Sequence, residues 1–316
     1  MKCRVCREPA VIDLRRHNAN FCAEHFLRHC CQQVERVIHD YKMFSPEDRL
    51  LVAVSGGKDS LAVWDILHEL GYAVDGLYVG LGIERYSGES LSYVSDFVDR
   101  RGLNLTIVDL GDTYGFDVPG AAEATGRVPC SACGLSKRHV FDSAAVDGKY
   151  DAVVTGHNLD DEAAVLYGNV MRWQVDYLGR QRPLLEARDG FPRKAKPLVR
   201  LTERETAAYC VLRGIDYQVE ECPMAIGNKH LGFKETLNLL EDRSPGSKAE
   251  FYFGYLKRAV DRFSDAEDRG RLGICSGCGA PTDAEVCAFC RLVSRSAGAT
   301  QPVAFKARNE ATVSKR

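Results

Sequence analysis

The feature that most constrains the fold of this chain is a regular alternation of short apolar runs with helix-like segments. Residues 50–54, Leu-Leu-Val-Ala-Val, form the first run and are predicted to be a buried strand. Further strands are expected at residues 74–79, 103–110 and 151–155, and helices at 59–70, 87–101, 134–146, from about 160, and at 203–213. Such alternation is typical of an α/β fold, a parallel sheet with helices on both faces. Residues 173–196 are rich in Arg, Gly and Pro, show no period, and are expected to form a long loop.

Composition and charge limit the class of protein. The 316 residues suffice for one α/β core with small appendages, and 45% of them are hydrophobic, which is ordinary for a soluble globular protein. No run approaches the roughly 18 apolar residues of a membrane helix, and the N-terminus lacks a secretory signal, so a cytoplasmic protein without a membrane partner is expected. The net charge is −2, yet residues 1–45 carry +3 and residues 291–316 carry +5, which leaves −10 between them. Two basic ends can contact the phosphates of a nucleic acid.

The chain is predicted to contain five parts. These are a metal-held module with a helix at residues 1–45, the α/β domain at 46–220, a helical extension at 221–270, a second metal module at 271–292, and a basic tail at 293–316.

A glycine-rich turn follows the first strand. Residues 55–60 read Ser-Gly-Gly-Lys-Asp-Ser and lead into a helix, whose free N-terminal N–H groups favour an anion. The glycines allow phosphate oxygens to approach the backbone, and Lys58 adds a cation. Kinase-like phosphate loops have a different spacing, because they need glycine at Val52 and Ser or Thr at Asp59. A capped strand-to-helix turn without a ligand is the alternative.

This turn resembles the SGGxDS loop of the ATP-pyrophosphatase (PP-loop) superfamily, also described as adenine nucleotide alpha hydrolase-like. The resemblance implies an enzyme that holds the β,γ-phosphates of ATP, cleaves at the α-phosphate and passes AMP to an oxygen of its substrate. Asp59 would help to hold Mg²⁺ on the pyrophosphate. The loop residues implied in ATP binding are Ser55, Gly56, Gly57, Lys58, Asp59 and Ser60.

A second loop supports the interpretation of residues 55–60 as a nucleotide-binding turn. Residues 156–162, Gly-His-Asn-Leu-Asp-Asp-Glu, follow the strand expected at 151–155, and the carboxyl ends of parallel strands are where ligands collect. The loop resembles the GHNxDD element of the tRNA-thiolating branch of the superfamily. That resemblance places Gly156 against the adenosine and Asp161 near the phosphates and metal. Alternatively or in addition, Asp160 caps the following helix.

Three cysteines in the middle of the chain form a separate group. Cys130 and Cys133 precede the helix that carries Lys137, and a helix N-terminus lowers the pKa of a thiol. Cys222 has no local partner. The set suits a nucleophile pair with a spare cysteine, or three thiolates on an iron–sulfur cluster with one iron open. Buried structural cysteines are the simplest alternative. Three further cysteines in helical stretches are interpreted as packing residues: Cys30, Cys31 and Cys210.

The run CSACGLSKR at residues 130–138, with GHNLDDEA downstream and Cys222-Pro223 after that, resembles the bacterial and archaeal tRNA 2-thiouridine synthetases that act on position 54 of the T loop. The resemblance extends from Cys3 to Cys290. It implies that Cys130, Cys133 and Cys222 hold a [4Fe–4S] cluster whose open iron binds the sulfide to be transferred. It also implies tRNA as substrate and a small ubiquitin-like protein with a C-terminal thiocarboxylate as sulfur donor, and it leaves a homodimer open.

Other branches of the superfamily fit less well. Relatives that thiolate anticodon position 34 typically carry a GVFRR-like run after the second cysteine, and the branch that acts on cytidine 32 lacks terminal zinc modules. Both differences favour position 54, with another uridine such as position 34 as the alternative.

Two sets of four metal ligands lie near the ends of the chain. The sets are Cys3, Cys6, Cys22 and His25, and Cys275, Cys278, Cys287 and Cys290. Four such ligands close a tetrahedral zinc site without a vacancy, so both zinc ions are expected to be structural. Arginines around both sets suggest RNA contact, and a purely stabilising role is the alternative.

The sequence therefore predicts ATP-dependent tRNA 2-thiolation, in which adenylation of the C2 oxygen of a uridine makes AMP the leaving group and sulfide attacks C2. Sulfur would be delivered through a cluster or a persulfide. Besides the turn at 55–60, the residues expected at the nucleotide are Ala53, Val79 and Gly156 at the adenosine and Lys137 and Asp161 at the phosphates and Mg²⁺. The residues expected in catalysis are Asp59, Cys130, Cys133, Lys137, Asp161 and Cys222.

Two rival functions come from other classes. A non-catalytic RNA- or protein-binding zinc scaffold would need neither Lys58 and Asp59 nor the Cys130 and Cys133 pair. An ATP-dependent amidotransferase-type ligase of the same superfamily would not need the three central cysteines.

Overall fold

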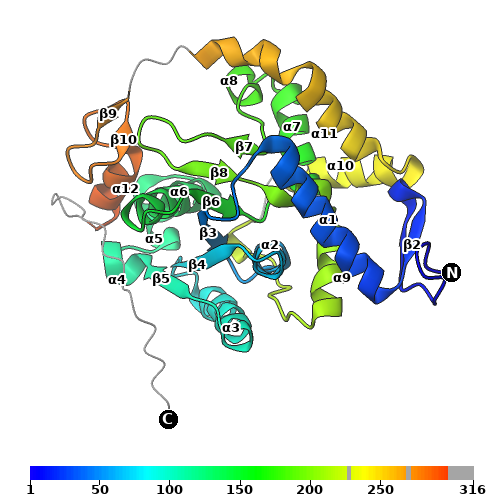
Figure 1. The fold of residues 1–316 in the computed structure, drawn as a ribbon. Coiled ribbons are helices and arrows are strands. Elements are labelled where there is room, and N and C mark those ends of the chain that lie inside the picture. The colour runs from blue at the N-terminus through cyan, green and yellow to red at the C-terminus, as the bar shows by residue number, and fades with distance from the viewer. Residues whose placement is uncertain (226–228, 268–271, 298–316) are drawn as a thin grey trace.

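A computed structural model describes residues 1–225, 229–267 and 272–297 (Figure 1). Its centre is a six-stranded sheet in the order β5-β4-β3-β6-β8-β7. The strands are β3 (Arg49–Val54), β4 (Ala73–Gly80), β5 (Leu105–Asp109), β6 (Ala152–Thr155), β7 (Leu184–Leu185) and β8 (Arg193–Ala195). Neighbouring strands pair in parallel, except that β7 pairs antiparallel with β8. The predicted parallel α/β sheet is confirmed.

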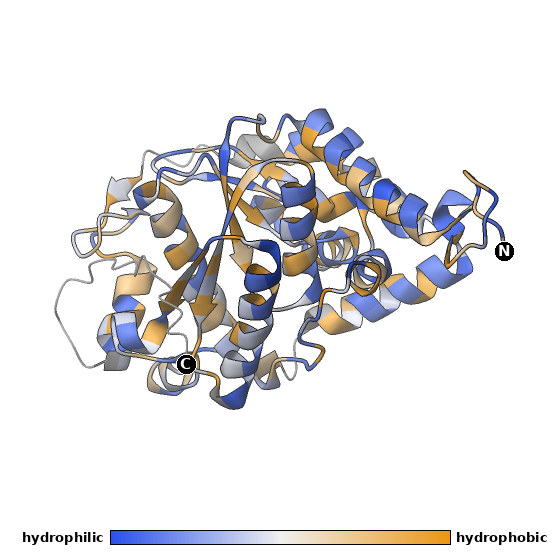
Figure 2. Cartoon of the chain, turned by 60° about the horizontal axis from the view of Figure 1, so that its bottom comes forward, coloured by the Kyte–Doolittle hydropathy of each residue, from blue (hydrophilic) through white to orange (hydrophobic). Residues whose placement is uncertain are grey.

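Side chains of the central strands alternate between two buried cores on opposite faces of the sheet. Leu50, Val52 and Val54 of β3 belong to the first core, whereas Leu51 belongs to the second. Successive side chains of a strand point to opposite faces, so a strand that is covered on both sides needs an unbroken apolar run. Figure 2 shows these hydrophobic strands in the interior, with helices of mixed polarity around them.

Helices cover both faces. The first core receives side chains from α1 (Ala23–Tyr41), α2 (Lys58–Glu69), α3 (Glu84–Arg101), α7 (Leu159–Met171), α8 (Val175–Leu178), α9 (Glu203–Arg213), α10 (Lys229–Arg243) and α11 (Ser247–Arg258). The second core receives them from α4 (Leu110–Tyr114), α5 (Val118–Thr125), α6 (Pro129–Asp147) and α12 (Ala288–Ala297). Short 3-10 turns are η1 (Arg15–His17), η2 (Pro197–Arg200), η3 (Pro223–Ala225) and η4 (Val260–Glu267). Among the described residues, no helix is both long and apolar enough to cross a membrane.

Two small modules flank the α/β domain on opposite sides (Figure 1). The N-terminal module is the antiparallel pair β1 (Ile12–Leu14) and β2 (Ala19–Phe21) with the start of α1. The C-terminal module is the antiparallel pair β9 (Gly273–Ile274) and β10 (Pro281–Thr282) with α12. Each presents one set of predicted zinc ligands.

Two predicted segments differ from the structure. Residues 173–196 were expected to form a loop, but they contain α8, β7 and β8. The sequence of β8, Arg-Lys-Ala, has no apolar alternation, and its pairing with β6 decides its conformation. The helix expected at 134–146 begins earlier, at Pro129, because proline suits the first helical position. Cys130 and Cys133 therefore lie within α6 and do not precede it.

The division into five parts stays a prediction. Its basic tail begins inside α12, and residues 298–316 of that tail lie outside the described residues, as do 226–228 and 268–271.

Candidate active site

The strand order reverses between β3 and β6. From β3 the chain continues to β4 and β5 on one side, and it then returns to place β6 on the other side. At such a point the carboxyl ends of neighbouring strands form a crevice in which ligands bind. Residues 55–60 follow β3 and residues 156–161 follow β6, so the two predicted nucleotide motifs flank the same crevice.

The turn after β3 depends on Gly56. Its φ is +77°, and a Cβ at this position would lie 2.6 Å from the backbone oxygen of Ser90, so only glycine fits. The Ser60 hydroxyl accepts a hydrogen bond from the Ser55 N–H (3.2 Å) and donates one to the Gly57 carbonyl (2.9 Å). Helix α2 begins at Lys58, so the unpaired N–H groups of its first turn are available beside the crevice.

Asp59 and Asp161, the two acidic residues predicted near Mg²⁺, are joined through Asn158. The Asn158 side-chain amide donates to Asp59 Oδ1 (3.0 Å), and its Oδ1 accepts from the Asp161 N–H (3.1 Å). Asn158 is thus the N-cap of α7, in place of the predicted Asp160, which accepts instead from the Glu203 N–H (2.9 Å). Carboxylate oxygens are the ligands that Mg²⁺ prefers, so these two residues suit the ion that accompanies ATP.

Two lysines neutralise these carboxylates. Lys58 Nζ lies 3.1 Å from Asp59 Oδ2 and 2.7 Å from Glu203 Oε1. Lys234 Nζ lies 2.6 Å from Asp161 Oδ1 and 3.4 Å from Glu203 Oε2. Burial favours the uncharged form of Lys58, but the carboxylates of Asp59 and Glu203 outweigh it and raise the pKa of this lysine. Burial raises the pKa of Asp59, because the charge of Lys58 offsets the desolvation only in part.

Glu203, Thr206 and Lys234 were missed at the level of sequence. Thr206 Oγ1 donates a short hydrogen bond to Asp59 Oδ1. A Thr-x-x-Glu capping box at residues 202–205 does mark the start of α9, where Glu203 lies. No sequence signal connects Lys234 on α10 with the crevice, because only the packing of α10 against α7 brings it there.

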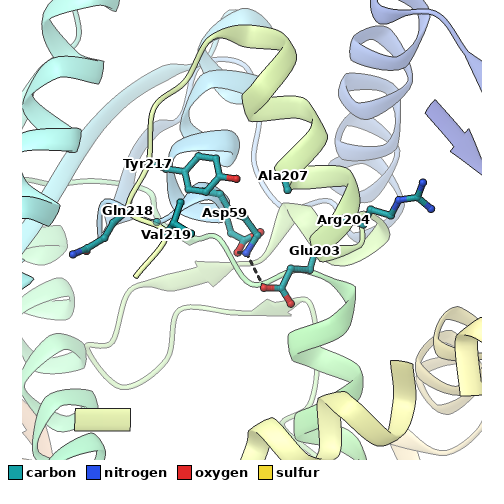
Figure 3. A pocket seen from close by; sticks show the side chains of 9 residues that line it. Asp59, Glu203, Arg204, Ala207, Tyr217, Gln218 and Val219 are labelled. Atoms are coloured by element: carbon teal, nitrogen blue, oxygen red, sulfur yellow. Dashed lines mark hydrogen bonds and ion pairs between the residues drawn. The ribbon is translucent and has the colours of Figure 1, made fainter. Parts of the chain in front are cut away.

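A cavity of about 410 Å³ opens beside the turn (Figure 3). Its lining consists of Gly57, Lys58 and Asp59 of the turn, Glu203, Arg204 and Ala207 of α9, and Tyr217, Gln218 and Val219. In Figure 3 the Glu203 carboxylate points toward Asp59, whereas the Arg204 guanidinium points away from the cavity.

The three residues predicted at the adenosine do not line this cavity. Ala53 and Val79 belong to the sheet face of the second core. A Cβ at Gly156 would lie 2.7 Å from the Ser60 nitrogen, so this glycine lets the turn after β6 pack closely against the start of α2. Their contact with adenosine stays a prediction.

The three central cysteines come together from two distant segments. Cys130 Sγ lies 3.6 Å from the Met224 carbonyl oxygen, and Cys133, Cys222 and Met224 pack against the second core. The charge of Lys137 acts on Cys133. The three sulfurs do not all lie within 4.8 Å of one another, in contrast to both zinc sets. The three cysteines therefore do not form a compact single-ion site like the two zinc sets.

The environment of Cys133 differs from the sequence-based expectation. The helix N-terminus was expected to lower the pKa of these thiols, but burial raises the pKa of Cys133, and Lys137 opposes this only in part. The reason is that Cys133 packs against the second core and is partly removed from water.

One backbone segment ties the cysteines to the phosphate turn. The Gln218 N–H donates to the Gly56 carbonyl (2.9 Å), and the Gln218 side chain donates to the Tyr86 carbonyl (3.2 Å). The same segment reaches Cys222 four residues later. The turn and the cysteine group therefore have a short covalent and hydrogen-bonded connection.

Both predicted zinc sets are assembled. In each set the four ligand atoms lie within 4.8 Å of one another. The Cys6–Cys22 and Cys278–Cys287 sulfur–sulfur distances are both 3.7 Å. A tetrahedral zinc ion with Zn–S bonds of about 2.3 Å holds its sulfurs about 3.8 Å apart. The two sets fit zinc, and neither has a vacant position for a substrate.

Comparison with known proteins agrees with this arrangement. A family model described as "2-thiouridine synthetase TtuA, N-terminal LIM domain" matches residues 2–27. The tRNA-5-methyluridine(54) 2-sulfurtransferase of Thermus thermophilus is 48% identical, with 92% of this chain and 91% of the relative covered. The chain belongs to the tRNA-5-methyluridine(54) 2-sulfurtransferase family. The resemblance stated from the sequence is confirmed.

A second member of this sulfurtransferase family and one solved structure are also similar to the chain. The enzyme of the same name from Pyrococcus horikoshii is 40% identical over 92% of this chain and 93% of its own. The solved structure of the U34-tRNA thiolase NcsA from Methanococcus maripaludis, with its [4Fe-4S] cluster, has a TM-score of 0.78. It is 26% identical, and the match covers 92% of this chain and 95% of NcsA. The chain thus shares its fold with this U34-tRNA thiolase.

Proposed function

We propose that this chain is an ATP-dependent tRNA sulfurtransferase that replaces the C2 oxygen of 5-methyluridine 54 with sulfur. The observation that carries the proposal is the junction of two sites. A phosphate-binding turn with Asp59 and Asp161 is linked through Gln218 to the segment that brings Cys222 near Cys130 and Cys133. The relatives named for thiolation at position 54 cover more than nine-tenths of the chain, which supports the choice of this uridine.

The nucleotide half of the site has a defined task. The uridine O2 attacks the α-phosphorus of ATP and pyrophosphate leaves, so negative charge has to be held on the departing phosphates. The N–H groups at the start of α2 and Lys58 supply positive charge there. Asp59 and Asp161 would hold Mg²⁺ on the pyrophosphate. Lys137 lies beside Cys133 and is assigned to the phosphates at the boundary of the two sites.

The sulfur half has to deliver a nucleophile to C2. When sulfide adds to C2, the bond to the adenylated oxygen breaks and AMP leaves with that oxygen. Cys130, Cys133 and Cys222 fit a [4Fe–4S] cluster in number, and such a cluster with three protein ligands would supply an iron with an open position for sulfide. Cys133 is partly buried and Cys130 is exposed, so one side of the set faces solvent.

The proposal also covers the substrate, the sulfur donor, the cellular location and the oligomeric state of the enzyme. The substrate is tRNA, and the sulfur donor is a small ubiquitin-like protein with a C-terminal thiocarboxylate. The enzyme works in the cytoplasm, and it can act as a homodimer. The exposure of Cys130 supports access for a carrier protein from the solvent side.

The test is reconstitution under anaerobic conditions with ATP, Mg²⁺, sulfide and tRNA from a strain that lacks the modification. Mass spectrometry of the digested tRNA should detect 2-thio-5-methyluridine, with AMP and pyrophosphate formed in equal amounts. Sulfur found at position 34 instead would redirect the assignment to another uridine. AMP formation without thiolated nucleoside, even with iron-loaded protein and sulfide, would contradict the proposal.

A further inference from the structure

Three metal-binding side chains converge where the N-terminal module meets the α/β domain. They are His17 at the end of η1, His29 on α1, and Glu205 in the first turn of α9. One ligand atom from each lies within 4.8 Å of the other two. Neither the zinc set of the N-terminal module nor the crevice at β3 and β6 includes any of them.

All three side chains hold a buried polar atom that has no hydrogen-bond partner among the described residues. These atoms are His17 Nε2, His29 Nε2 and Glu205 Oε1. The distance from His17 Nε2 to Glu205 Oε1 is 4.0 Å, too long for a hydrogen bond. An unpaired buried polar atom is destabilising, because it has lost its hydrogen bonds to water without gaining a partner. Three side chains that converge at one point, each with such an atom, therefore indicate a missing shared partner.

The other atoms of the cluster leave these three free for a cation. Arg16 Nη2 donates to Glu205 Oε2 at 2.6 Å, and the Thr202 N–H and hydroxyl donate to the same oxygen at 2.6 and 2.9 Å. Oε1 is thus the free oxygen of a carboxylate whose orientation is fixed, as outer-shell partners fix metal ligands. His29 is held by stacking on Phe21, with ring centroids 5.0 Å apart.

Both imidazoles are in the form that binds metal. Burial and the nearby Arg16 lower the pKa of His17 to about 4, and burial lowers the pKa of His29. Near neutral pH both rings are uncharged and carry a lone pair on one nitrogen. A charged histidine paired with Glu205 is therefore disfavoured as the explanation of the cluster.

We propose that His17, His29 and Glu205 form a third metal site, which binds a zinc ion. Two imidazole nitrogens and one carboxylate oxygen are ligands that suit zinc. Bonds of about 2.0–2.1 Å would bring the ligand atoms to about 3.4 Å from one another, so each side chain closes by about an ångström or less. The fourth position is left to water. The ion would fasten η1 and α1 to the first turn of α9, two residues from Glu203 and its contact with Lys58.

Metal counting on the full-length protein tests the site. The wild type and the variants His17→Gln and His29→Gln are dialysed against the same buffer with free zinc at micromolar level and analysed for zinc. We expect about three zinc ions per chain in the wild type and about two in each variant, since the cysteine sets retain theirs. His39→Gln is the matched control, because His39 lies on the same helix α1 with 91% of its side chain exposed, and it should retain about three.

Thermal unfolding gives a second readout. Added zinc should raise the midpoint of the wild type and of His39→Gln, because an ion that binds only the folded state stabilises it. It should leave the midpoint of His17→Gln unchanged. A wild type that saturates at two zinc ions would overturn the site. A third ion that remains in both His17→Gln and His29→Gln would also overturn it, because that ion is then held elsewhere.

Discussion

Asp59 connects the phosphate turn to the start of α7 and to α9. Its Oδ1 accepts hydrogen bonds from Asn158 and Thr206, and its Oδ2 lies 3.1 Å from Lys58 Nζ. The SGGxDS resemblance identified Asp59 directly, and Lys58 was identified as a cation within the same turn, because a loop motif keeps its functional residues adjacent in sequence. It did not identify Thr206 or Glu203, since their contacts depend on how α9 packs beside α2.

Asp59→Ala and Lys58→Ala should each lower the rate of AMP and pyrophosphate formation by about 10²-fold or more, because they remove charges that act on the phosphates. Both side chains border a cavity and neither binds zinc, so both variants should still fold and keep their zinc. The exposed Asp96→Ala on α3 serves as control and should keep full AMP formation. Undiminished pyrophosphate release by Asp59→Ala would show that the turn does not bind the reacting nucleotide.

Cys133 distinguishes the two routes of sulfur transfer. After anaerobic reconstitution, Cys133→Ser should lose the broad visible absorption of an iron–sulfur cluster, because two remaining thiolates no longer hold the cubane. Cys31→Ser, at a half-buried position away from the group, should keep it. If Cys133→Ser contains no iron and still thiolates tRNA at the wild-type rate, a persulfide relay through Cys130 and Cys222 replaces the cluster mechanism.

At the level of elements, one buried carboxylate holds three helices together. Asp65 of α2 is fully buried and is contacted by Arg101 of α3 and by Tyr209 and Arg213 of α9. Burial alone would raise the pKa of Asp65, but the hydrogen bonds from Arg213, Arg101 and Tyr209 outweigh it and lower the pKa.

Asp65→Asn should lower the free energy of unfolding by about 3–5 kcal/mol at neutral pH, because it leaves two arginines with a neutral partner. A carboxylate whose pKa is depressed by folding stabilises the protein above its unfolded pKa of about 3.9, and this contribution is lost as the pH falls through the folded value. Denaturant unfolding should therefore show a difference in the free energy of unfolding between wild type and variant. This difference should be constant near neutral pH and become smaller below about pH 4. A difference that does not depend on pH would contradict this role. So would a destabilisation no larger than that of the control Asp99→Asn, whose side chain is exposed.

The elements differ in how well the sequence predicts them. Strand β3 was predicted within one residue, because a strand that is covered on both faces has to be continuously apolar. Helix α9 was predicted over its whole length, since Thr202 caps it and Gly214 ends it. Strand β8 was missed, because a strand of three residues carries too little pattern, and its pairing with β6 on one side and β7 on the other decides its conformation.

On the scale of the whole molecule, the C-terminal module packs on the second core, and Phe289 is its largest fully buried side chain. Phe289 is 1% exposed, stacks on His139 of α6 with centroids 4.0 Å apart, and meets Tyr114 of α4 edge-on at 5.0 Å. The spacing of the zinc ligands predicted the module, but it did not predict that the module would pack against α4 and α6.

Zinc binding and docking should be separable. Phe289→Ala should keep its zinc but lower the free energy of unfolding by about 3–5 kcal/mol, the usual effect of removing a buried phenylalanine. Cys278→Ser should lose about one zinc ion. The control Ile274→Ala, at a residue that is 77% exposed in the same module, should resemble the wild type in both metal content and unfolding. Loss of zinc from Phe289→Ala would show instead that the site forms only when the module is docked.

The ion pair between Lys58 and Glu203 also bears on how nucleotide enters. Without ATP the ammonium group already has an anionic partner 2.7 Å away, so a phosphate has to exchange with Glu203 at this lysine. The displaced carboxylate has a second cation within 3.4 Å, the Nζ of Lys234. When ATP binds, a phosphate therefore replaces the Glu203 carboxylate at Lys58, and the carboxylate remains paired with Lys234. As a consequence, the affinity for ATP should depend less steeply on ionic strength than two unpaired lysines would make it.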